Sequence, residues 1–319
     1  MFNVRLPYSE LSILPWEQVG ALERAVKELP TVSIVIPIYN SGCFLEKTIR
    51  SLLCNDLSGV ELILMDGGSS DDTMEIVEHY KDIFTVIHSA PDKGQSDAIN
   101  KGFEKATGDI LYWLNGDDIL LPNTLNKVRQ HFLSHSECDV LVGNAYMTEI
   151  DFTPINHFIF SPEKLEFKYL LDYAKNHLIQ PSVFFSRKAW KKTGPLDIDD
   201  HYAMDADLFI GMAKNFSLQH IELDIAYSVY HEACKTRGAR AESITSLASV
   251  QAKHGGFVES AATLKILVDL YHQLETETTS KVKAAEAKVK AAEARISAIE
   301  EHSERQKELL LQVDLEQHP

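Results

Sequence analysis

The sequence contains few cysteines, no excess of basic residues and no long hydrophobic run. Its four cysteines, Cys43, Cys54, Cys138 and Cys234, form no C-x-x-C pair, which excludes a zinc-finger pattern and a secreted disulfide framework. The 319 residues carry a formal net charge of -16, which argues against nucleic-acid binding because a phosphate backbone requires a basic face. No apolar run approaches the roughly 18 residues needed to cross a bilayer.

The first 30 residues also lack the apolar segment of a signal peptide. Arg5 is followed by Glu10, Glu17, Glu23 and Glu28, a pattern that does not fit a leader. We therefore expect a soluble cytoplasmic protein with reduced cysteines. Its length exceeds that of a typical single domain, and this predicts one large domain with appendages or two domains.

Short apolar runs alternate with segments of helical spacing in the first half of the chain. The candidate strands lie at residues 32–37, 61–65, 84–87 and 109–114. This alternation predicts an α/β fold with a mostly parallel sheet flanked by helices. Such sheets bind ligands at the carboxyl ends of their strands, so the polar residues that follow the strands are candidate site residues.

The second half of the chain has a different pattern. Residues 131–240 are mixed, with candidate strands at 140–142 and 182–185, and the chain turns helical from Ala241. The heptapeptide that begins at Lys281 is repeated without change from Lys288.

This repeat predicts a coiled coil at residues 280–319, through which we expect the protein to form a homo-oligomer. The alternative is a single solvated helix, because alanine packs weakly in a seam. Ser303 and Gln306 interrupt the seam. Its apolar a and d positions are Val282, Ala285, Val289, Ala292, Ile296, Ile299, Leu310 and Val313.

The turn after the first strand argues against a dehydrogenase. It reads Pro37-Ile38-Tyr39-Asn40-Ser41-Gly42 and lacks the G-x-G-x-x-G pattern of a dinucleotide site. Tyr39 nevertheless offers a stacking face, and Asp66 at the end of the second strand suits hydrogen bonds from a nucleobase or ribose. The alternative for Asp66 is an Asx turn with the two glycines that follow it.

Asn115-Gly116-Asp117-Asp118 follows the fourth strand. Two adjacent carboxylates suit Mg²⁺ or Mn²⁺, hard cations that prefer oxygen ligands and can hold a diphosphate. The alternative is a polar turn, because such residue pairs are frequent in turns.

Four ordered motifs over about 90 residues resemble the family 2 glycosyltransferases, whose fold is named GT-A. They occupy residues 32–40, 65–73, 91–102 and 106–118, and weaker similarity continues to about residue 240. The resemblance implies an inverting enzyme that uses a nucleotide-diphosphate sugar, with a UDP-sugar favoured, and Mn²⁺ or Mg²⁺. It also implies bacterial surface-polysaccharide synthesis, with a saccharide or lipid-linked saccharide acceptor and peripheral association with the inner face of the plasma membrane.

The resemblance also assigns roles residue by residue. Asp66 would bind the base, and Asp118 would bind the metal directly, while Asp117 would serve the ribose or a water of the cation. The implied donor-binding residues are Pro37, Tyr39, Asn40, Asp66, Gly94, Gln95, Asp97, Asp117, Lys235 and Arg237.

The general base is expected in Met204-Asp205-Ala206-Asp207, a stretch similar to the Glu-Asp motif of the family. Met204 replaces the glutamate, so the role falls on Asp205. Asp207 is the second choice, and the alternative for it is a helix cap or a structural acid.

Two further segments resemble family elements. Tyr230 to Thr236 is similar to R-x-H-x-x-S-K-T, in which His231 would complete the metal site or contact the diphosphate; the alternative is a solvated histidine. Tyr230 and Cys234 depart from that consensus. Gln180-Pro181-Ser182 resembles an acceptor-side element, or it simply begins an edge strand after a proline.

These observations predict an N-terminal extension (1–30), a GT-A domain (31–240), a helical segment (241–279) and a coiled-coil tail (280–319). Two rival functions remain open. A sugar-phosphate nucleotidyltransferase would need a basic, glycine-rich loop after the first strand, which this chain lacks there. A non-catalytic scaffold assembled by the coiled coil is the other rival, and the retained acids argue against it.

Overall fold

The computed structural model of the chain describes residues 14–18, 28–231, 234 and 239–317, with the side chains of 18, 292–296 and 298–317 excepted. The chain divides into two compact units, residues 1–264 and 265–319. The finer division expected at residues 240 and 279 stays a prediction.

The first unit contains a mixed sheet, to which nine strands of the described residues belong. Their order is β3-β2-β1-β4-β8-β6-β9-β5, and β7 pairs with β6. The β3-β2-β1-β4 half is parallel throughout, and β6 also runs parallel to β9. The strands are β1 (Val32–Ile38), β2 (Val60–Asp66), β3 (Val86–Ser89), β4 (Ile110–Trp113), β5 (Ile119–Leu120), β6 (Val140–Thr148), β7 (Pro154–Phe158), β8 (Val183–Ser186) and β9 (Leu218–Val229).

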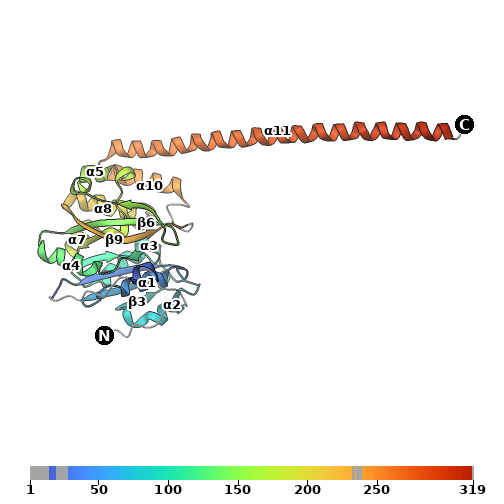
Figure 1. Cartoon of the computed structure of the whole chain (residues 1–319). Helices are drawn as coiled ribbons and strands as arrows, with labels where there is room; N and C mark the ends of the chain where they lie inside the picture. Colours follow the sequence, from blue (N-terminus) through green and yellow to red (C-terminus); the bar gives the residue numbers. More distant parts are fainter. Residues whose placement is uncertain (1–13, 19–27, 232–233, 235–238, 318–319) are drawn as a thin grey trace. The chain divides into compact units, whose positions relative to one another are not determined.

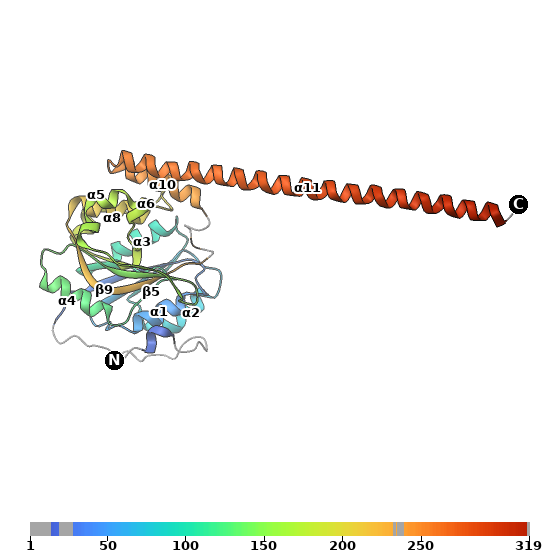
Figure 2. The same cartoon turned by 45° about the horizontal axis from the view of Figure 1, so that its top comes forward.

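Helices cover both faces of this sheet, with α1 and α2 on one side and α3 and α8 on the other (Figures 1 and 2). Alternate residues of β1 explain the two layers: Ile34 and Ile36 face the core with α1, whereas Val35 faces the core with α3. The α-helices are α1 (Leu45–Leu53), α2 (Thr73–Tyr80), α3 (Gln95–Lys105), α4 (Thr124–Ser134), α5 (Phe167–Leu171), α6 (Tyr173–Asn176), α7 (Arg187–Thr193), α8 (Met204–Asn215), α10 (Arg240–Lys253) and α11 (Phe257–Gln317).

The predicted α/β architecture is confirmed, and the four strands predicted before residue 115 are all present. The strand predicted at 140–142 is longer and extends to Thr148. Strand β9 is not among the predicted strands, although Ile221, Leu223 and Ile225 alternate with polar residues as in a half-buried strand.

The described part of the N-terminal segment packs against the α/β unit. A short 3-10 helix, η1 (Pro15–Gln18), places the Trp16 ring edge-on to Phe152, with 4.5 Å between ring centroids. Glu17 accepts a 2.6 Å hydrogen bond from Arg50 Nε on α1. Within the residues that the structure describes, no helix combines the length and apolarity that crossing a membrane requires.

The contact between α3 and β1 yields a stability prediction. A Cβ atom at Gly102 on α3 would lie 2.4 Å from Val35 Cγ1, so Gly102→Ala should push the helix off the sheet. We expect the free energy of unfolding, measured by urea titration, to fall by about 1–3 kcal/mol.

Gly211 on α8 is the matched control, because its Cβ would meet nothing closer than 3.5 Å. Gly211→Ala should leave stability unchanged or raise it by about 0.5–1 kcal/mol, since alanine is the better helix former. Equal effects of the two substitutions would contradict the close approach of α3 to β1.

Candidate active site

A cleft of about 860 Å³ opens where the parallel strands of the sheet end. The turns after β1, β2, β3 and β4 line one side of it, and the start of α8 and the end of β9 line the other. The predicted site residues that line this cleft are Pro37, Tyr39, Gly94, Gln95, Asp117, Asp118 and Asp205. The structure therefore brings predicted site residues together in one cleft, although Pro37 and Asp205 lie 168 positions apart in the sequence.

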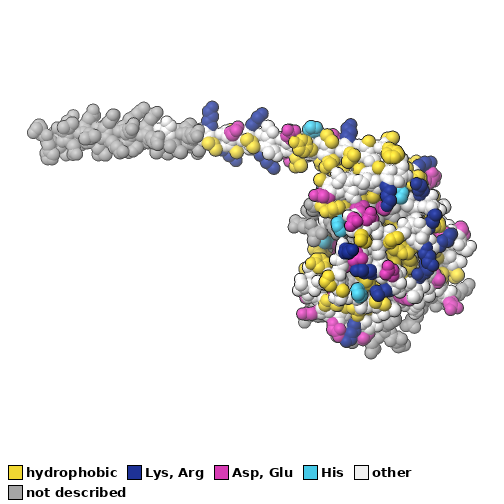
Figure 3. All heavy atoms as spheres, turned by 180° about the vertical axis from the view of Figure 1, so that it is seen from behind, with side chains coloured by type: hydrophobic (Ala, Val, Ile, Leu, Met, Phe, Trp, Pro, Cys, Tyr) yellow, Lys and Arg dark blue, Asp and Glu magenta, His cyan; other side chains and the backbone are white. Residues whose placement is uncertain are grey.

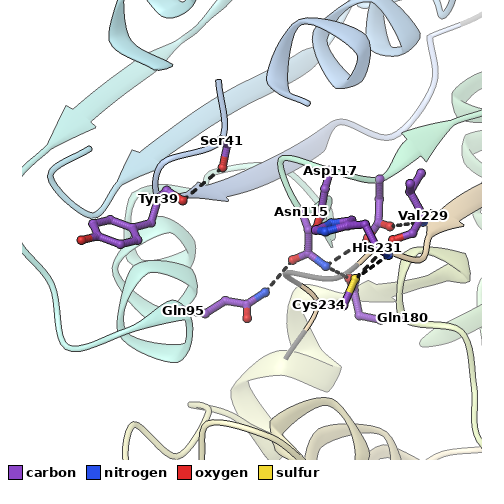
Figure 4. A network of polar contacts seen from close by, with 10 residues as sticks. Tyr39, Ser41, Gln95, Asn115, Asp117, Gln180, Val229, His231 and Cys234 are labelled. Carbon is purple, nitrogen blue, oxygen red and sulfur yellow. Dashed lines mark hydrogen bonds and ion pairs between the residues drawn. The ribbon is translucent and has the colours of Figure 1, made fainter. Parts of the chain in front are cut away.

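Asp117 and His231 meet at one end of the cleft (Figure 4). His231 Nε2 lies 2.9 Å from Asp117 Oδ2, and the Phe44 ring stacks on the imidazole at 4.3 Å between centroids. Among the described residues, donor atoms of Asp117, His231 and Cys234 lie within 4.8 Å of one another. This set joins a carboxylate to an imidazole, a pair that suits Mn²⁺, and adds a softer sulfur donor.

The neighbouring Asp118 is buried and serves a different role. Its Oδ1 accepts a 3.1 Å hydrogen bond from the Val229 backbone N–H, and its Oδ2 accepts a 3.0 Å hydrogen bond from Asn115 Nδ2. Burial, together with the charge of Asp117, raises the pKa of Asp118 well above its usual value. The cluster of donor atoms thus includes Asp117 and not Asp118, whose role as a direct metal ligand stays a prediction.

A chain of side-chain amides crosses the floor of the cleft (Figure 4). Gln95 Nε2 donates to Asn115 Oδ1 at 2.7 Å, and Asn115 Nδ2 donates to Gln180 Oε1 at 3.0 Å. Gln180 in turn donates to the Trp113 carbonyl at 3.0 Å. Gln180, predicted on the acceptor side, is therefore joined to the loop that carries Asp117.

Asp66 lies beneath the cleft and not among the described residues that line it, and its predicted contact with the base stays a prediction. Its side chain is 2% exposed, and its carboxylate accepts hydrogen bonds from Ser69 Oγ at 2.5 Å and Ser89 Oγ at 2.6 Å. These bonds hold the turn whose Gly67 and Gly68 do line the cleft. Asp66 thus shapes the floor of the cleft, as the Asx-turn alternative implied.

Asn40 and Asp97 also point away from the cleft lining formed by the described residues. Asn40 adopts a left-handed backbone (φ 48°), and its Oδ1 accepts a hydrogen bond from Ser70 N at 2.9 Å. Asp97 accepts hydrogen bonds from Lys101 Nζ at 2.7 Å and Lys93 N at 3.0 Å, and the bond from Lys101 contributes most to lowering its pKa. Both residues brace loops in this way, and their predicted donor contacts stay predictions.

The two candidate bases lie on opposite sides of α8. Asp205 lines the cleft, and burial raises the pKa of its carboxyl to about 6. Asp207 lies 2.7 Å from His254 Nε2 and from Lys253 Nζ; burial acts to raise its pKa, but these partners hold it below its usual value. The structure therefore places Asp207 away from the cleft, where it acts as a structural acid that pairs with His254 and Lys253.

Two predicted site residues have no described position, and three residues that line the cleft were not predicted. Lys235 and Arg237 lie outside the described residues. Sequence reasoning missed Asp92, His201 and Tyr202, which line the cleft. Asp92 follows β3, so the rule about strand ends could have found it, whereas the other two precede α8 in a segment without a regular pattern.

Comparison with known proteins identifies the family. The sequence model of Glycosyl transferase family 2 matches residues 33–194. The PGL/p-HBAD biosynthesis glycosyltransferase of Mycobacterium bovis is 28% identical over 207 residues, which are 64% of this chain and 77% of the relative. The putative teichuronic acid biosynthesis glycosyltransferase TuaG of Bacillus subtilis is 31% identical over 153 residues, 47% of this chain and 59% of the relative.

Solved structures share the fold. The mannosyltransferase PcManGT from Pyrobaculum calidifontis, in complex with GDP-Man and Mn²⁺, superposes with a TM-score of 0.53 at 16% identity over 80% of each chain. S. aureus TarS 1-349 in complex with UDP-GlcNAc gives a TM-score of 0.54 at 18% identity, over 69% of this chain and 66% of that fragment. This chain spans 39% of the longer TarS chain. Since the family model covers just over half of its length, the chain belongs to glycosyl transferase family 2 and is a glycosyltransferase with a GT-A-like fold.

Proposed function

We propose that the protein transfers a sugar from a nucleotide-diphosphate donor, a UDP-sugar by preference, to a hydroxyl of a saccharide or lipid-linked saccharide, with inversion at the anomeric carbon. One observation carries this proposal: a single cleft is lined by both Asp117 and Asp205, and His231 Nε2 lies 2.9 Å from the Asp117 carboxylate. A donor diphosphate and an acceptor hydroxyl each require one of these two groups.

The donor nucleotide would lie along the turns after β1 and β2. The Tyr39 ring is 65% exposed at the cleft and offers a face on which a base can stack. Gly67 and Gly68 expose backbone there, and a Cβ at Gly67 would lie 2.8 Å from an Asp92 carboxylate oxygen. The narrow gap between these turns supports a flat ligand.

Asp117 and His231 would hold Mn²⁺ or Mg²⁺ beside the diphosphate, and Cys234 is close enough to contribute. When bound, the cation would offset the negative charge of the departing nucleotide diphosphate. The Phe44 ring fixes the plane of the imidazole, so the Nε2 atom is already directed at Asp117. Fixing a ligand in this way reduces the cost of ordering it when the cation binds.

Asp205 would take the proton of the acceptor hydroxyl. The hydroxyl oxygen bonds to the anomeric carbon as the bond from that carbon to the diphosphate breaks, and the electron pair leaves with the nucleotide diphosphate. A pKa of about 6 keeps Asp205 largely ionised at neutral pH and makes it a stronger base than an exposed aspartate. Met204 also lines the cleft, but a thioether cannot act as a general base; its sulfur accepts a 2.8 Å hydrogen bond from Ser96 Oγ.

The acceptor would enter beside His201 and Tyr202, which line the cleft next to Asp205. The names of the mycobacterial and Bacillus relatives support an acceptor in cell-surface glycan synthesis. A lipid-linked acceptor would require peripheral contact with the inner face of the membrane. The proposal also includes self-association through residues 280–319.

A donor screen tests the proposed function. UDP-, GDP- and dTDP-sugars are added with Mn²⁺, and thermal unfolding and release of nucleotide diphosphate are measured. We expect one UDP-sugar to stabilise the fold, by about 2.7 kcal/mol at 100 times its Kd, and to be turned over. Absence of both binding and turnover would identify a scaffold, and pyrophosphate release from UTP and a sugar phosphate would identify a nucleotidyltransferase.

The metal site yields a second prediction. Asp117→Asn should lower Mn²⁺ affinity at least ~10-fold, because the substitution removes a charged ligand that His231 and Phe44 hold in place. The measurement is titration of the free protein with Mn²⁺, followed by electron paramagnetic resonance. Asp224→Asn is the control, because Asp224 pairs with His157 on β7 and lies off the cleft lining. Unchanged affinity in Asp117→Asn, or an equal loss in both variants, would contradict the assignment.

The base assignment yields a third prediction. Asp205→Asn should lower kcat about 10²–10⁴-fold with little change in donor KM, because it removes proton transfer and not donor binding. In the unmodified enzyme, kcat/KM should fall below about pH 6, as the Asp205 carboxylate becomes protonated and can no longer accept the hydroxyl proton.

Asp207→Asn on the same helix is the matched control. The Asp207→Asn variant should keep its turnover. It should lose some thermal stability, because His254 and Lys253 would no longer have the Asp207 carboxylate as an ion-pair partner. The base would have to be reassigned to Asp207 if this variant, and not Asp205→Asn, lost turnover.

A further inference from the structure

Helix α11 carries a surface that the proposed chemistry does not use. It runs for 61 residues, about 90 Å at 1.5 Å per residue. Every residue from Tyr271 to Ala291 is exposed. A helix gains most of its stability from packing an apolar face. We therefore expect a long exposed helix with apolar residues to pack against another polypeptide segment.

The apolar residues of α11 form a seam that begins before the sequence repeat. Counting back from Val282 in steps of four and three passes the polar Thr278 and Glu275 and then reaches Tyr271, Val268 and Leu264 in the same heptad frame. Val268, Tyr271, Val282 and Val289 are each at least 50% exposed. Figure 3 shows hydrophobic side chains along the described part of this helix, with lysines beside them.

A shallow groove of about 580 Å³ follows the same face between Tyr271 and Glu286. Glu275 and Thr278 occupy two seam positions within it and separate the seam into two apolar blocks. His272 Nδ1 lies 3.7 Å from Glu275 Oε2, so the acid has a cationic partner on its own helix when the histidine is protonated. Polar seam residues of this kind specify register at a cost in stability.

The charges that flank the seam identify the partner. Lysine or arginine occupies the g position of three successive heptads, and glutamate occupies the e position that each would meet in a parallel second copy. The three pairs are Lys281 with Glu286, Lys288 with Glu293, and Arg295 with Glu300. An antiparallel pair would instead place g beside g and e beside e, which opposes like charges along the whole segment.

The seam residues also indicate the number of helices. The a positions of the repeat hold Val282, Val289 and Ile296, all β-branched. Branched residues at a favour two-stranded parallel coils, and the small Ala285 at d allows close approach of two helices.

We propose that a second copy of this chain binds along α11, so that the two helices form a parallel, two-stranded coiled coil whose seam begins near Leu264. The pairing buries the exposed valines of the seam and joins each g lysine to an e glutamate of the other copy.

Adjacent alanines provide a matched test in the full-length protein. Ala285→Asp with Ala292→Asp places acids at two d positions, whereas Ala284→Asp with Ala291→Asp places them at two c positions one residue earlier. Sedimentation equilibrium should show that the unmodified chain is a dimer. The dissociation constant of the dimer should rise at least about 100-fold in the d-position variant, because carboxylates would be buried against each other. The c-position variant should remain dimeric.

Both variants should keep the thermal transition of the α/β unit, which shows that the change lies in the helix. A monomeric unmodified chain at micromolar concentration, a trimer or tetramer, or equal dissociation of the two variants would overturn the proposal.

Orientation is tested with Thr278→Cys, again in the full-length chain. Thr278 lies at d, so mild oxidation of a parallel dimer should join the two new cysteines in a disulfide-linked dimer. Thr279→Cys, one residue along, and the unmodified chain with its native cysteines are the controls and should cross-link far less. A dimer that forms but does not cross-link through position 278 would overturn the parallel arrangement.

Discussion

The buried carboxylate of Asp118 is the contact on which the rest of the site depends. It joins the turn after β4 to the end of β9 through the Val229 backbone, across 111 residues of sequence. The Asn115–Gln180 bond and the Asp117–His231 contact also join the two halves of the sheet at the cleft. Asp118 differs in being a buried acid, and burying an acid is costly unless it is hydrogen-bonded. Asp117 and His231 lie next to the two ends of this link, so their meeting follows from it.

The parallel half of the sheet could be predicted well from the sequence, because each strand and the turn after it lie within one short segment. Tyr39 and Asp117 were found in this way, as residues that follow apolar runs, whereas Pro37 and Gln95 were assigned through the resemblance to the family. The direction of a side chain in such a turn is harder to predict. Asp66 is turned inward by serine hydroxyls on its own turn and on β3, and nothing in its local sequence shows that those partners converge.

The other side of the cleft depends on contacts between distant segments. Gln180, His201 and Tyr202 precede regular elements and reach the cleft only because β8, β9 and α8 pack beside the parallel strands. The choice between Asp205 and Asp207 shows the limit of sequence reasoning. Residues two apart on a helix differ by about 200° in direction, so only one of them can face the cleft, and packing decides which.

The reason why the pKa of Asp205 is raised determines which changes in solution can alter that pKa. Burial is the largest cause, and the charge of Asp200 is the smallest of those that act on it. Dissolved salt screens charges that face water but does not rehydrate a buried carboxyl. Under the proposed role of Asp205, the acid limb of the pH profile should therefore depend little on ionic strength. It should respond instead to whatever fills the cleft, since a ligand that displaces water also changes the medium around this carboxyl.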